Sequence, residues 1–473
     1  MRLLIVCKVF LAISALLLWS PISSEEIYED GKSICSKCEC IKTPDGETMY
    51  INCVNRQIKH VVSDWPEEVE KIVATFSQNE ITTLQTFPGS AARLELVFDH
   101  CNIENLETGL FESSLGVFYL DLSYNKLTSD TLSADVFKGP YNETNFEPIP
   151  LEYLNLAYNE IHTLHKNVFE HTPNLKYLNL EGNDFGVIDD MTALAFSFIP
   201  ALKSFNIANN ELTDVTENVL KNFRGLNKLD ISNNDLDFIP KSMGILTALE
   251  ILIMDNNPIT FLDDETFLGL DDLLEISARN LTRLERIRTN TFAQVKKLKK
   301  LDLSQNEMLA NIDQQAFLRS EKLKYLNLSN TKLSTLLPDI LDWSELEVLD
   351  LSDNQLFCDC NLYNISQQLS DDIKRERDGP YCKDIRTTIS YEIFSLTSSI
   401  CSDMPYVPDY MGKPHAGSRL LRISLVLLSV VLIVSVFIAA ILGFAKWRSW
   451  QRNQSYPFAS QIVYNPITTN VHF

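Results

Sequence analysis

The chain has 473 residues and a formal net charge of −22 at pH 7. This length suits two or three globular domains, or one long repeat array with appended modules. A strongly negative field repels phosphate backbones and anionic lipid headgroups, so the composition argues against nucleic-acid binding. The negative charge favours either a basic binding partner or a charged surface that only keeps the protein soluble.

The first 24 residues have the layout of a secretory signal peptide. Arg2 precedes an apolar centre at residues 11–19, and the small residues Ser23 and Ser24 precede two glutamates. An uncleaved anchor helix is the alternative, but the apolar centre is short for a membrane span. We therefore expect residues 1–24 to be a leader and the chain after them to be exported.

A second apolar run, residues 423–445, contains no charged residue. At about 1.5 Å per residue it is long enough to cross a hydrocarbon core of roughly 30 Å. Lys446 and Arg448 follow it, as is typical of a cytoplasmic flank. We expect one transmembrane helix in a type I, single-pass plasma-membrane protein, preceded by a proline-containing stalk at 403–419.

Charge is unevenly divided between these compartments. The leader carries +2 and residues 420–473 carry +4, which leaves −28 on the exported portion. The predicted cytoplasmic tail, residues 446–473, is too short for a catalytic domain. Two short patterns in it indicate adaptor partners. The segment from Tyr464 to Ile467 resembles a tyrosine-based sorting signal, and the end of the chain, with Val471 and Phe473, resembles a PDZ ligand.

The middle of the chain repeats the pattern Leu-x-x-Leu-x-Leu-x-x-Asn-x-Leu about every 24 residues. The alternation within each copy predicts a short strand with one face inward, and stacked copies predict a parallel sheet. The asparagine position identifies twelve copies within residues 71–356. It is occupied by Asn79, Cys101, Asn125, Asn159, Asn183, Asn210, Asn234, Asn257, Arg279, Asn306, Thr331 and Asn354.

Two kinds of side chain should hold each coil together. An inward asparagine offers both a donor and an acceptor to the unpaired backbone of the turn. A phenylalanine often follows and should fill the opposite side of the coil as core, not as a cofactor contact. These phenylalanines are Phe87, Phe111, Phe137, Phe169, Phe267, Phe292 and Phe317.

Eight of the ten cysteines fall in two groups that flank the repeats. Cys7 belongs to the leader, and Cys101 occupies an asparagine position. Zinc binding by Cys35 and Cys38 is an alternative to disulfides, but an exported chain meets an oxidising compartment. Each group of four leaves three connectivities open. The groups are Cys35, Cys38, Cys40 and Cys53 before the repeats, and Cys358, Cys360, Cys382 and Cys401 after them.

With these repeats and flanks the sequence resembles the extracellular leucine-rich-repeat family, the type found in Slit, the Nogo receptor and Toll-like receptor ectodomains. The resemblance implies caps at 30–70 and 357–402. Cys101 is left over as an odd thiol, which in an exported protein can form an intermolecular bridge, but this family also has cysteine at the asparagine position, which implies a buried structural thiol. The tryptophan usual in the second cap is missing. The resemblance also implies the pairs Cys35 with Cys40, Cys38 with Cys53, Cys358 with Cys382, and Cys360 with Cys401.

The expected fold is an α/β leucine-rich-repeat solenoid. It has a curved parallel sheet on the concave face, an irregular or short-helical convex face, disulfide caps and one transmembrane helix. Solenoids generally bind ligands on the concave sheet. Tyrosine suits an exposed strand as well as an interface, so the two interpretations compete. The candidate ligand-binding residues are Tyr119, Asp121, Tyr153, Asn155, Tyr177 and Asn179.

Other surface features point less clearly to a binding role. Lys299, Lys300 and Lys324 form a basic spot that either meets an acidic or sulfated ligand or is plain solvated surface. Residues 138–150 exceed the repeat length and should form a projecting loop. Sequons on the exported side predict glycans, and one on the sheet at residue 327 would move binding toward the N-terminal coils. The predicted glycosylation sites are Asn142, Asn280, Asn327 and Asn364.

Function follows from these parts. No nucleophile elbow, zinc-protease motif or phosphate-binding glycine loop is found, so we expect no enzyme and no cofactor. We expect a cell-surface adhesion molecule or receptor for an extracellular protein or glycoconjugate. The alternative is a co-receptor in innate-immune or growth-factor signalling. The sequence leaves open whether the chain forms a homo-oligomer.

Overall fold

The computed structural model describes residues 34–60, 64–114, 116–374, 380–385 and 387–402. The chain divides into two units, Met1–Asp403 and Met404–Phe473. Among the described residues, no helix combines the length and apolar character that a membrane span requires. The predicted leader, stalk, span and tail motifs lie outside the described residues, so they stay predictions.

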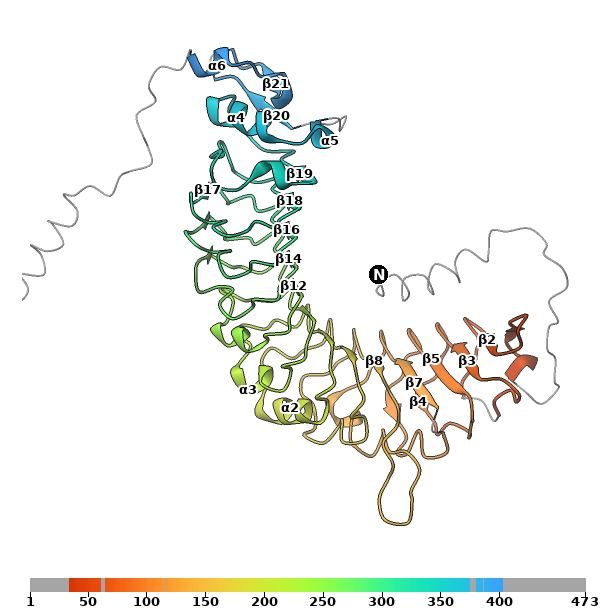
Figure 1. Ribbon diagram of the computed structural model, residues 1–473. Helices are drawn as coiled ribbons and strands as arrows, with labels where there is room; N and C mark the ends of the chain where they lie inside the picture. The colour runs from red at the N-terminus through yellow and green to blue at the C-terminus, as the bar shows by residue number, and fades with distance from the viewer. Residues whose placement is uncertain (1–33, 61–63, 115, 375–379, 386, 403–473) are drawn as a thin grey trace, which may run out of the picture. The chain divides into compact units, whose positions relative to one another are not determined.

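Most of the first unit is a stack of coils joined by one 14-stranded sheet, which lies on the inner side of the bend of this unit (Figure 1). The first two strands pair antiparallel, and all later neighbours pair parallel. The prediction of stacked parallel strands is confirmed. In sheet order the strands are β1 (Glu39–Lys42), β2 (Thr48–Asn52), β3 (Lys71–Thr75), β5 (Arg93–Val97), β7 (Val117–Asp121), β8 (Tyr153–Asn155), β9 (Tyr177–Asn179), β10 (Ser204–Asn206), β11 (Lys228–Asp230), β12 (Ile251–Ile253), β14 (Glu275–Ser277), β16 (Lys300–Asp302), β18 (Tyr325–Asn327) and β19 (Val348–Asp350).

The outer side of the coils carries short elements, among them the helices α2 and α3 (Figure 1). Two small parallel sheets add to it. These elements are β4 (Thr83–Leu84) with β6 (Asn105–Leu106), β13 (Phe261–Leu262) with β15 (Arg286–Ile287) and β17 (Asn311–Ile312), α2 (Asp190–Ala195), α3 (Glu217–Leu220), and the 3-10 turns η2 (Ser129–Thr131), η3 (Phe196–Phe198), η4 (Lys241–Ile245) and η5 (Trp343–Glu345).

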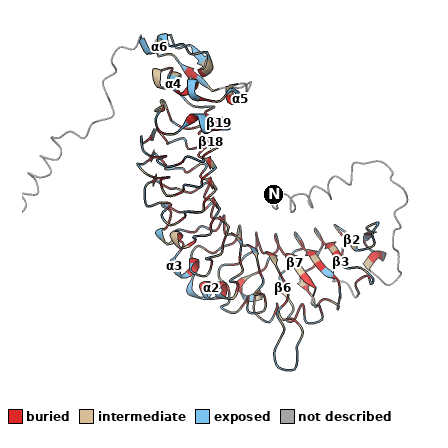
Figure 2. Ribbon diagram, viewed as in Figure 1, coloured by how far each residue is buried: buried red, intermediate tan, exposed pale blue. Residues whose placement is uncertain are grey.

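The strands form because their side chains alternate between core and surface. In β9, Leu178 is 2% exposed while Tyr177 is 41% exposed. Leu178 pairs in register with Leu154 on one side and Phe205 on the other, so the inward residues form a continuous core. Buried positions therefore recur in every coil (Figure 2). Each buried side chain is worth about 1.5–3 kcal/mol, but only while neighbouring coils cover it.

The phenylalanines of the outer side extend this core. All seven predicted ones are buried. Rings from successive coils lie close together, with centroids 5.6 Å apart for Phe267 and Phe292 and 5.0 Å apart for Phe292 and Phe317. The prediction that these residues are core is confirmed.

The asparagines form a ladder through the interior, as Asn234 illustrates. Its Oδ1 accepts hydrogen bonds from the backbone N–H groups of Asn210 and Leu212, each at 3.0 Å. Its Nδ2 donates to the carbonyls of Ile207 at 3.1 Å and Ile231 at 3.0 Å. One side chain thus satisfies backbone groups of two adjacent coils, which explains why the position is polar although it is buried.

The assignment of Arg279 to this ladder is wrong. Asn306 Oδ1 accepts from the backbone N–H of Leu281, and Leu281 follows the positive-φ residue Asn280, as ladder asparagines follow theirs. Leu281 is buried and occupies the asparagine position. Arg279 lies two residues earlier, where its Nη2 is 2.7 Å from a carboxylate oxygen of Asp255. This coil has no asparagine at the position, so the pattern was placed two residues too early.

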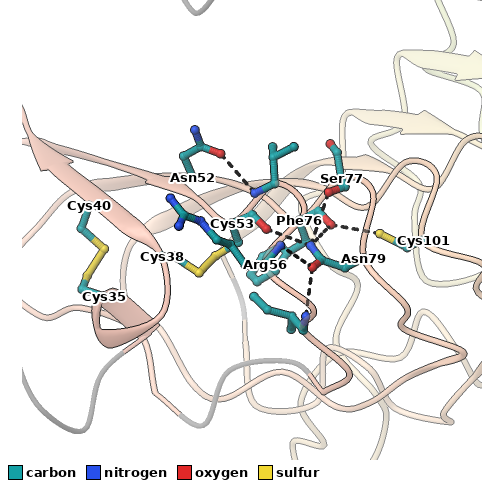
Figure 3. The surroundings of a disulfide bond; sticks show 12 residues. Cys35, Cys38, Cys40, Asn52, Cys53, Arg56, Phe76, Ser77, Asn79 and Cys101 are labelled. Carbon is teal, nitrogen blue, oxygen red and sulfur yellow. Dashed lines mark hydrogen bonds between the residues drawn. A yellow bond between two sulfur atoms is a disulfide. The ribbon is translucent and has the colours of Figure 1, made fainter.

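Both ends of the stack carry disulfides, and the pairs are those that the family resemblance implies. At the N-terminal end one disulfide joins the 3-10 turn η1 (Ile34–Ser36) to β1, and the other joins the loop between them to the residue after β2 (Figure 3). The C-terminal cap contains α4 (Cys360–Gln368), α5 (Asp371–Lys374), β20 (Tyr381–Lys383), β21 (Ser390–Glu392), η6 (Ile393–Ser395) and α6 (Ser399–Ser402). The bonds are Cys35–Cys40, Cys38–Cys53, Cys358–Cys382 and Cys360–Cys401.

A tryptophan does contact the C-terminal cap, although it precedes the cap in sequence. Trp343 is fully buried in η5, which packs against α4. Its Nε1 donates a hydrogen bond to the carbonyl of Pro338 at 3.1 Å. At the start of α4 the Asp359 carboxylate accepts from the backbone N–H of Leu362 at 2.8 Å and caps the helix.

Cys101 is a free, buried thiol within the ladder. Its Sγ donates to the carbonyl of Phe76 at 3.1 Å, an acceptor it shares with the Nδ2 of Asn79 (Figure 3). Its backbone N–H donates to Asn125 Oδ1 at 3.0 Å. Burial raises the pKa of the thiol to about 11. The thiol therefore replaces an asparagine in the interior and is not a reactive group.

Candidate ligand-binding face

A first row of tyrosines crosses three neighbouring strands of the inner sheet. Tyr119, Tyr153 and Tyr177 pair in register across β7, β8 and β9. The rings of Tyr119 and Tyr153 are stacked, with centroids 4.2 Å apart, and Tyr177 is tilted with its centroid 6.0 Å from Tyr153. The pKa of Tyr119 lies far above its usual value, mainly because the side chain is buried and secondly because Tyr153 is next to it. The sequence prediction thus identified a set of side chains that are in direct contact.

A second aromatic row lies just beyond the ends of these strands. His100, Tyr124 and Tyr158 occupy equivalent positive-φ turns and are stacked, with successive centroids 4.4 Å apart. The row ends at Gly182, which has the same left-handed conformation. None of these four residues is among the candidate ligand-binding residues predicted from sequence. Their shared place in the repeat could have identified this row from the sequence, because all four residues directly precede an asparagine position.

Short polar side chains separate the two rows. Asp121, Asn155 and Asn179 pair in register, and the Oδ1 of each accepts from the backbone N–H two residues further on, at 2.9 to 3.1 Å. The same bond recurs outside the candidate face, as in Asp302 with Ser304. These three candidate residues therefore have a structural role in closing the strand ends, whatever they contact outside.

The carboxylate of Asp121 is buried and lies close enough to Tyr119 and Tyr153 to add to the effect of burial in raising the pKa of both. Its side chain accepts hydrogen bonds from the Ser123 hydroxyl at 2.6 Å and from Asn155 Nδ2 at 2.9 Å. Burial raises the pKa of Asp121 above its usual value, and the hydrogen bonds oppose this. Asp121, Ser123 and Ala157 are all buried although they belong to the inner face.

Glu181 connects this polar strip to the second aromatic row. Its Oε1 accepts from the Tyr158 hydroxyl, and its Oε2 accepts from Asn206 Nδ2, both at 2.9 Å. Burial and the bond to Glu181 raise the pKa of Tyr158 to about 12. We call the five tyrosines, with Asp121 and Glu181, the tyrosine face. The five tyrosines are Tyr119, Tyr124, Tyr153, Tyr158 and Tyr177.

The basic spot predicted from sequence is largely neutralised. Lys300 Nζ is 2.6 Å from Glu275, and Lys324 Nζ is 2.9 Å from Glu345. Because each of these lysines has a carboxylate within ion-pair distance, an anionic ligand gains little there. This favours the interpretation of the spot as solvated surface.

The predicted glycosylation sites differ in exposure. Asn142 and Asn364 are exposed, whereas Asn280 and Asn327 are half-buried. Asn142 lies in the predicted loop, which projects from the stack (Figure 1, golden). Asn327 lies on β18, and its Oδ1 accepts from the Ser329 backbone at 2.9 Å. These four positions stay predictions.

A polar hollow lies on the outer side near β13 and β15. Its charged groups pair with each other, as Arg286 Nε lies 2.7 Å from Asp313, and Arg288 stacks over the ring of Phe261 at 3.9 Å. Within the described residues, no group of three or more histidine, cysteine or acidic side chains could hold a metal ion. Both arginines of the hollow thus have a carboxylate within ion-pair distance, Arg286 with Asp313 and Arg288 with Asp263, so the hollow offers no free cation to an anionic ligand.

Comparisons with known proteins agree with this architecture. The family model described as Leucine rich repeat matches residues 144–185, 200–259, 247–308, 280–333 and 296–356. Tsukushi from Gallus gallus is 28% identical over 302 residues, which cover 55% of this chain and 77% of that protein. Chaoptin from Drosophila melanogaster is 30% identical over 145 residues, 27% of this chain and 11% of that protein.

Two further likenesses concern a human protein and a solved structure. Human oligodendrocyte-myelin glycoprotein is 29% identical over 190 residues, 38% of this chain and 41% of that protein. A chain in the octameric complex of Latrophilin 3, Unc5D and the leucine-rich-repeat part of FLRT2 superposes with a TM-score of 0.50 at 20% identity. It covers 77% of this chain and 98% of that chain, and it shows the shared fold.

The repeats, the capped ends and these likenesses define a class of protein. The chain is a leucine-rich-repeat protein of the extracellular kind, with disulfide-bonded caps. Its inner sheet carries the tyrosine face described above.

Proposed function

We propose that the chain is a cell-surface binding protein that engages an extracellular protein through the tyrosine face. The observation that carries this proposal is the pair of aromatic rows, in which Tyr124 is 45% and Tyr177 41% exposed. Tyrosine offers a large contact area at a low entropic cost, and stacking fixes the rings before a ligand arrives. The predicted span at 423–445 would attach the protein to the plasma membrane.

Two other features support the use of the N-terminal coils. A glycan on Asn327 would cover part of the sheet near β18 and leave β7, β8 and β9 open. The basic spot farther along is neutralised by ion pairs. A contact surface on the tyrosine face therefore avoids both, and no catalytic constellation competes for the same residues.

The experiment is extracellular proximity labelling around the full chain expressed on cells. The face variant carries Tyr153→Ala and Tyr177→Ala. The matched control replaces the exposed apolar residues Met191 and Leu194 of the outer helix α2 with alanine. We expect partners that label with wild type and control to be lost from the face variant. Equal labelling by both variants, at equal surface expression, would remove the tyrosine face from consideration.

A co-receptor role is the second candidate, since the predicted tail is too short to signal alone. Aggregation of cells that express only this chain would favour adhesion between identical copies. Recruitment of a second receptor after ligand addition would favour the co-receptor. Both roles use the same inner face. They differ in the partner that joins the complex, which is a second copy of this chain in adhesion and a different receptor in the co-receptor role.

A further inference from the structure

The stacking of the tyrosines limits what the tyrosine face can recognise. Tyr124 has His100 over one face of its ring and Tyr158 over the other, each 4.4 Å away. Ring faces used in this way cannot also stack on a sugar or on a cation. Specific recognition must then come from hydrogen bonds and from charge.

Two carboxylates near the rings, those of Asp121 and Glu181, carry negative charge. Among the ion pairs of the described residues, neither Asp121 nor Glu181 has a lysine or arginine partner, although both accept hydrogen bonds from neutral groups. Two lysines of neighbouring coils are already engaged. Lys71 pairs with Glu95 at 2.9 Å, and Lys176 pairs with Glu152 at 2.8 Å.

Burial makes this charge more effective. Asp121 is buried, and the lower dielectric around it screens its field less than water would. Glu181 is half-buried at the surface and can contact a ligand directly. The two residues belong to coils two strands apart, a separation of about 10 Å at the usual strand spacing.

From this arrangement we infer that the ligand binds through an extended segment carrying arginine or lysine side chains. Same-side residues of an extended chain lie about 7 Å apart. One basic side chain of such a segment can pair with the half-buried Glu181, and a second is attracted by the field of the buried Asp121 without contacting it. A sulfated glycan would be repelled by the same face. This inference rests on the proposed function and names the chemistry of its ligand.

The test uses a fluorescent peptide of alternating arginine and glycine, titrated onto cells that display the full chain. The face variant is Asp121→Asn with Glu181→Gln. Its matched control, Asp190→Asn with Glu217→Gln, removes the same charge from the exposed outer helices α2 and α3. We expect wild type and control to bind equally, and the face variant to bind at least tenfold more weakly. Glu181→Lys alone, which leaves the buried Asp121 in place, should also lose binding.

Three outcomes would overturn the inference. Equal loss in face and control variants would mean that only net charge matters. Equal binding by wild type and the face variant would mean that the carboxylates play no part. Tighter binding of a heparin fragment than of the peptide would mean a sulfated ligand. The proposed function is tested separately, because the tyrosine-to-alanine variant can lose its labelled partner whether or not the peptide binds.

Discussion

The ring of Tyr158 lies directly over Gly182, so that a Cβ on this glycine would come within 2.5 Å of Tyr158 Cδ1. Gly182 also has a φ of +65°, which side chains disfavour. The second aromatic row therefore needs a glycine at its end.

Gly182→Ala should displace the Tyr158 ring and break its hydrogen bond to Glu181. We expect a loss of about 1–2 kcal/mol from the left-handed backbone and the contact together. Urea unfolding of the purified full chain measures it. Adding Tyr158→Ala should recover part of the loss, because it removes the contact but not the backbone cost. Strict additivity of the two changes would contradict the packing described above.

Asn234→Ala should destabilise the stack by about 2–4 kcal/mol, because it leaves two N–H groups and two carbonyls of the interior without their side-chain partner. The urea midpoint of the same preparation reports the effect. Asn218→Ala, on the exposed surface of α3, is the control and should shift the midpoint little. A similar midpoint for both variants would show that the ladder bonds do not stabilise the coils.

The sequence predicted the coil interior well because period-two alternation and the asparagine position are local signals. Phe267 and Asn234 could be assigned from spacing alone. Leu281 could not be assigned in this way, because its coil has an apolar residue in place of the asparagine. Without the asparagine as a marker, the repeat pattern also matches at Arg279, two residues earlier. The structural bonds of Asp121, Asn155 and Asn179 were also missed, since a sequence shows which face a side chain is on but not which backbone group it meets.

Cys101 should resist alkylation by iodoacetamide in the folded protein near pH 8 and react fully in urea. Burial holds the pKa of its thiol at about 11, against 9.0 for an exposed thiol, so the reactive thiolate is scarce. Since the folded pKa is the higher one, the unfolded state ionises first as pH rises. Stability should therefore fall between about pH 9 and pH 11, and this part of the fall should be absent in Cys101→Ala. Rapid labelling without denaturant would contradict the buried position.

The ion pair of Arg279 with Asp255 should be coupled, because it joins two adjacent coils around a carboxylate that is almost fully buried. Arg279 Nε also donates to Asp255 at 2.8 Å, so the contact has two bonds. Removing the arginine leaves the buried carboxylate without a cation, while removing both side chains leaves no uncompensated charge. In a double-mutant cycle of Arg279→Ala and Asp255→Ala, we expect the double variant to be more stable than the sum of the two single losses predicts, by about 1–3 kcal/mol.

The cycle is read from urea midpoints, with Arg283→Ala and Asp237→Ala as the control pair. That pair also lies within ion-pair distance, at 3.1 Å, but both of its side chains are exposed, so its coupling should be much smaller. Equal coupling in the two cycles would mean that burial of Asp255 adds nothing to the contact between these coils.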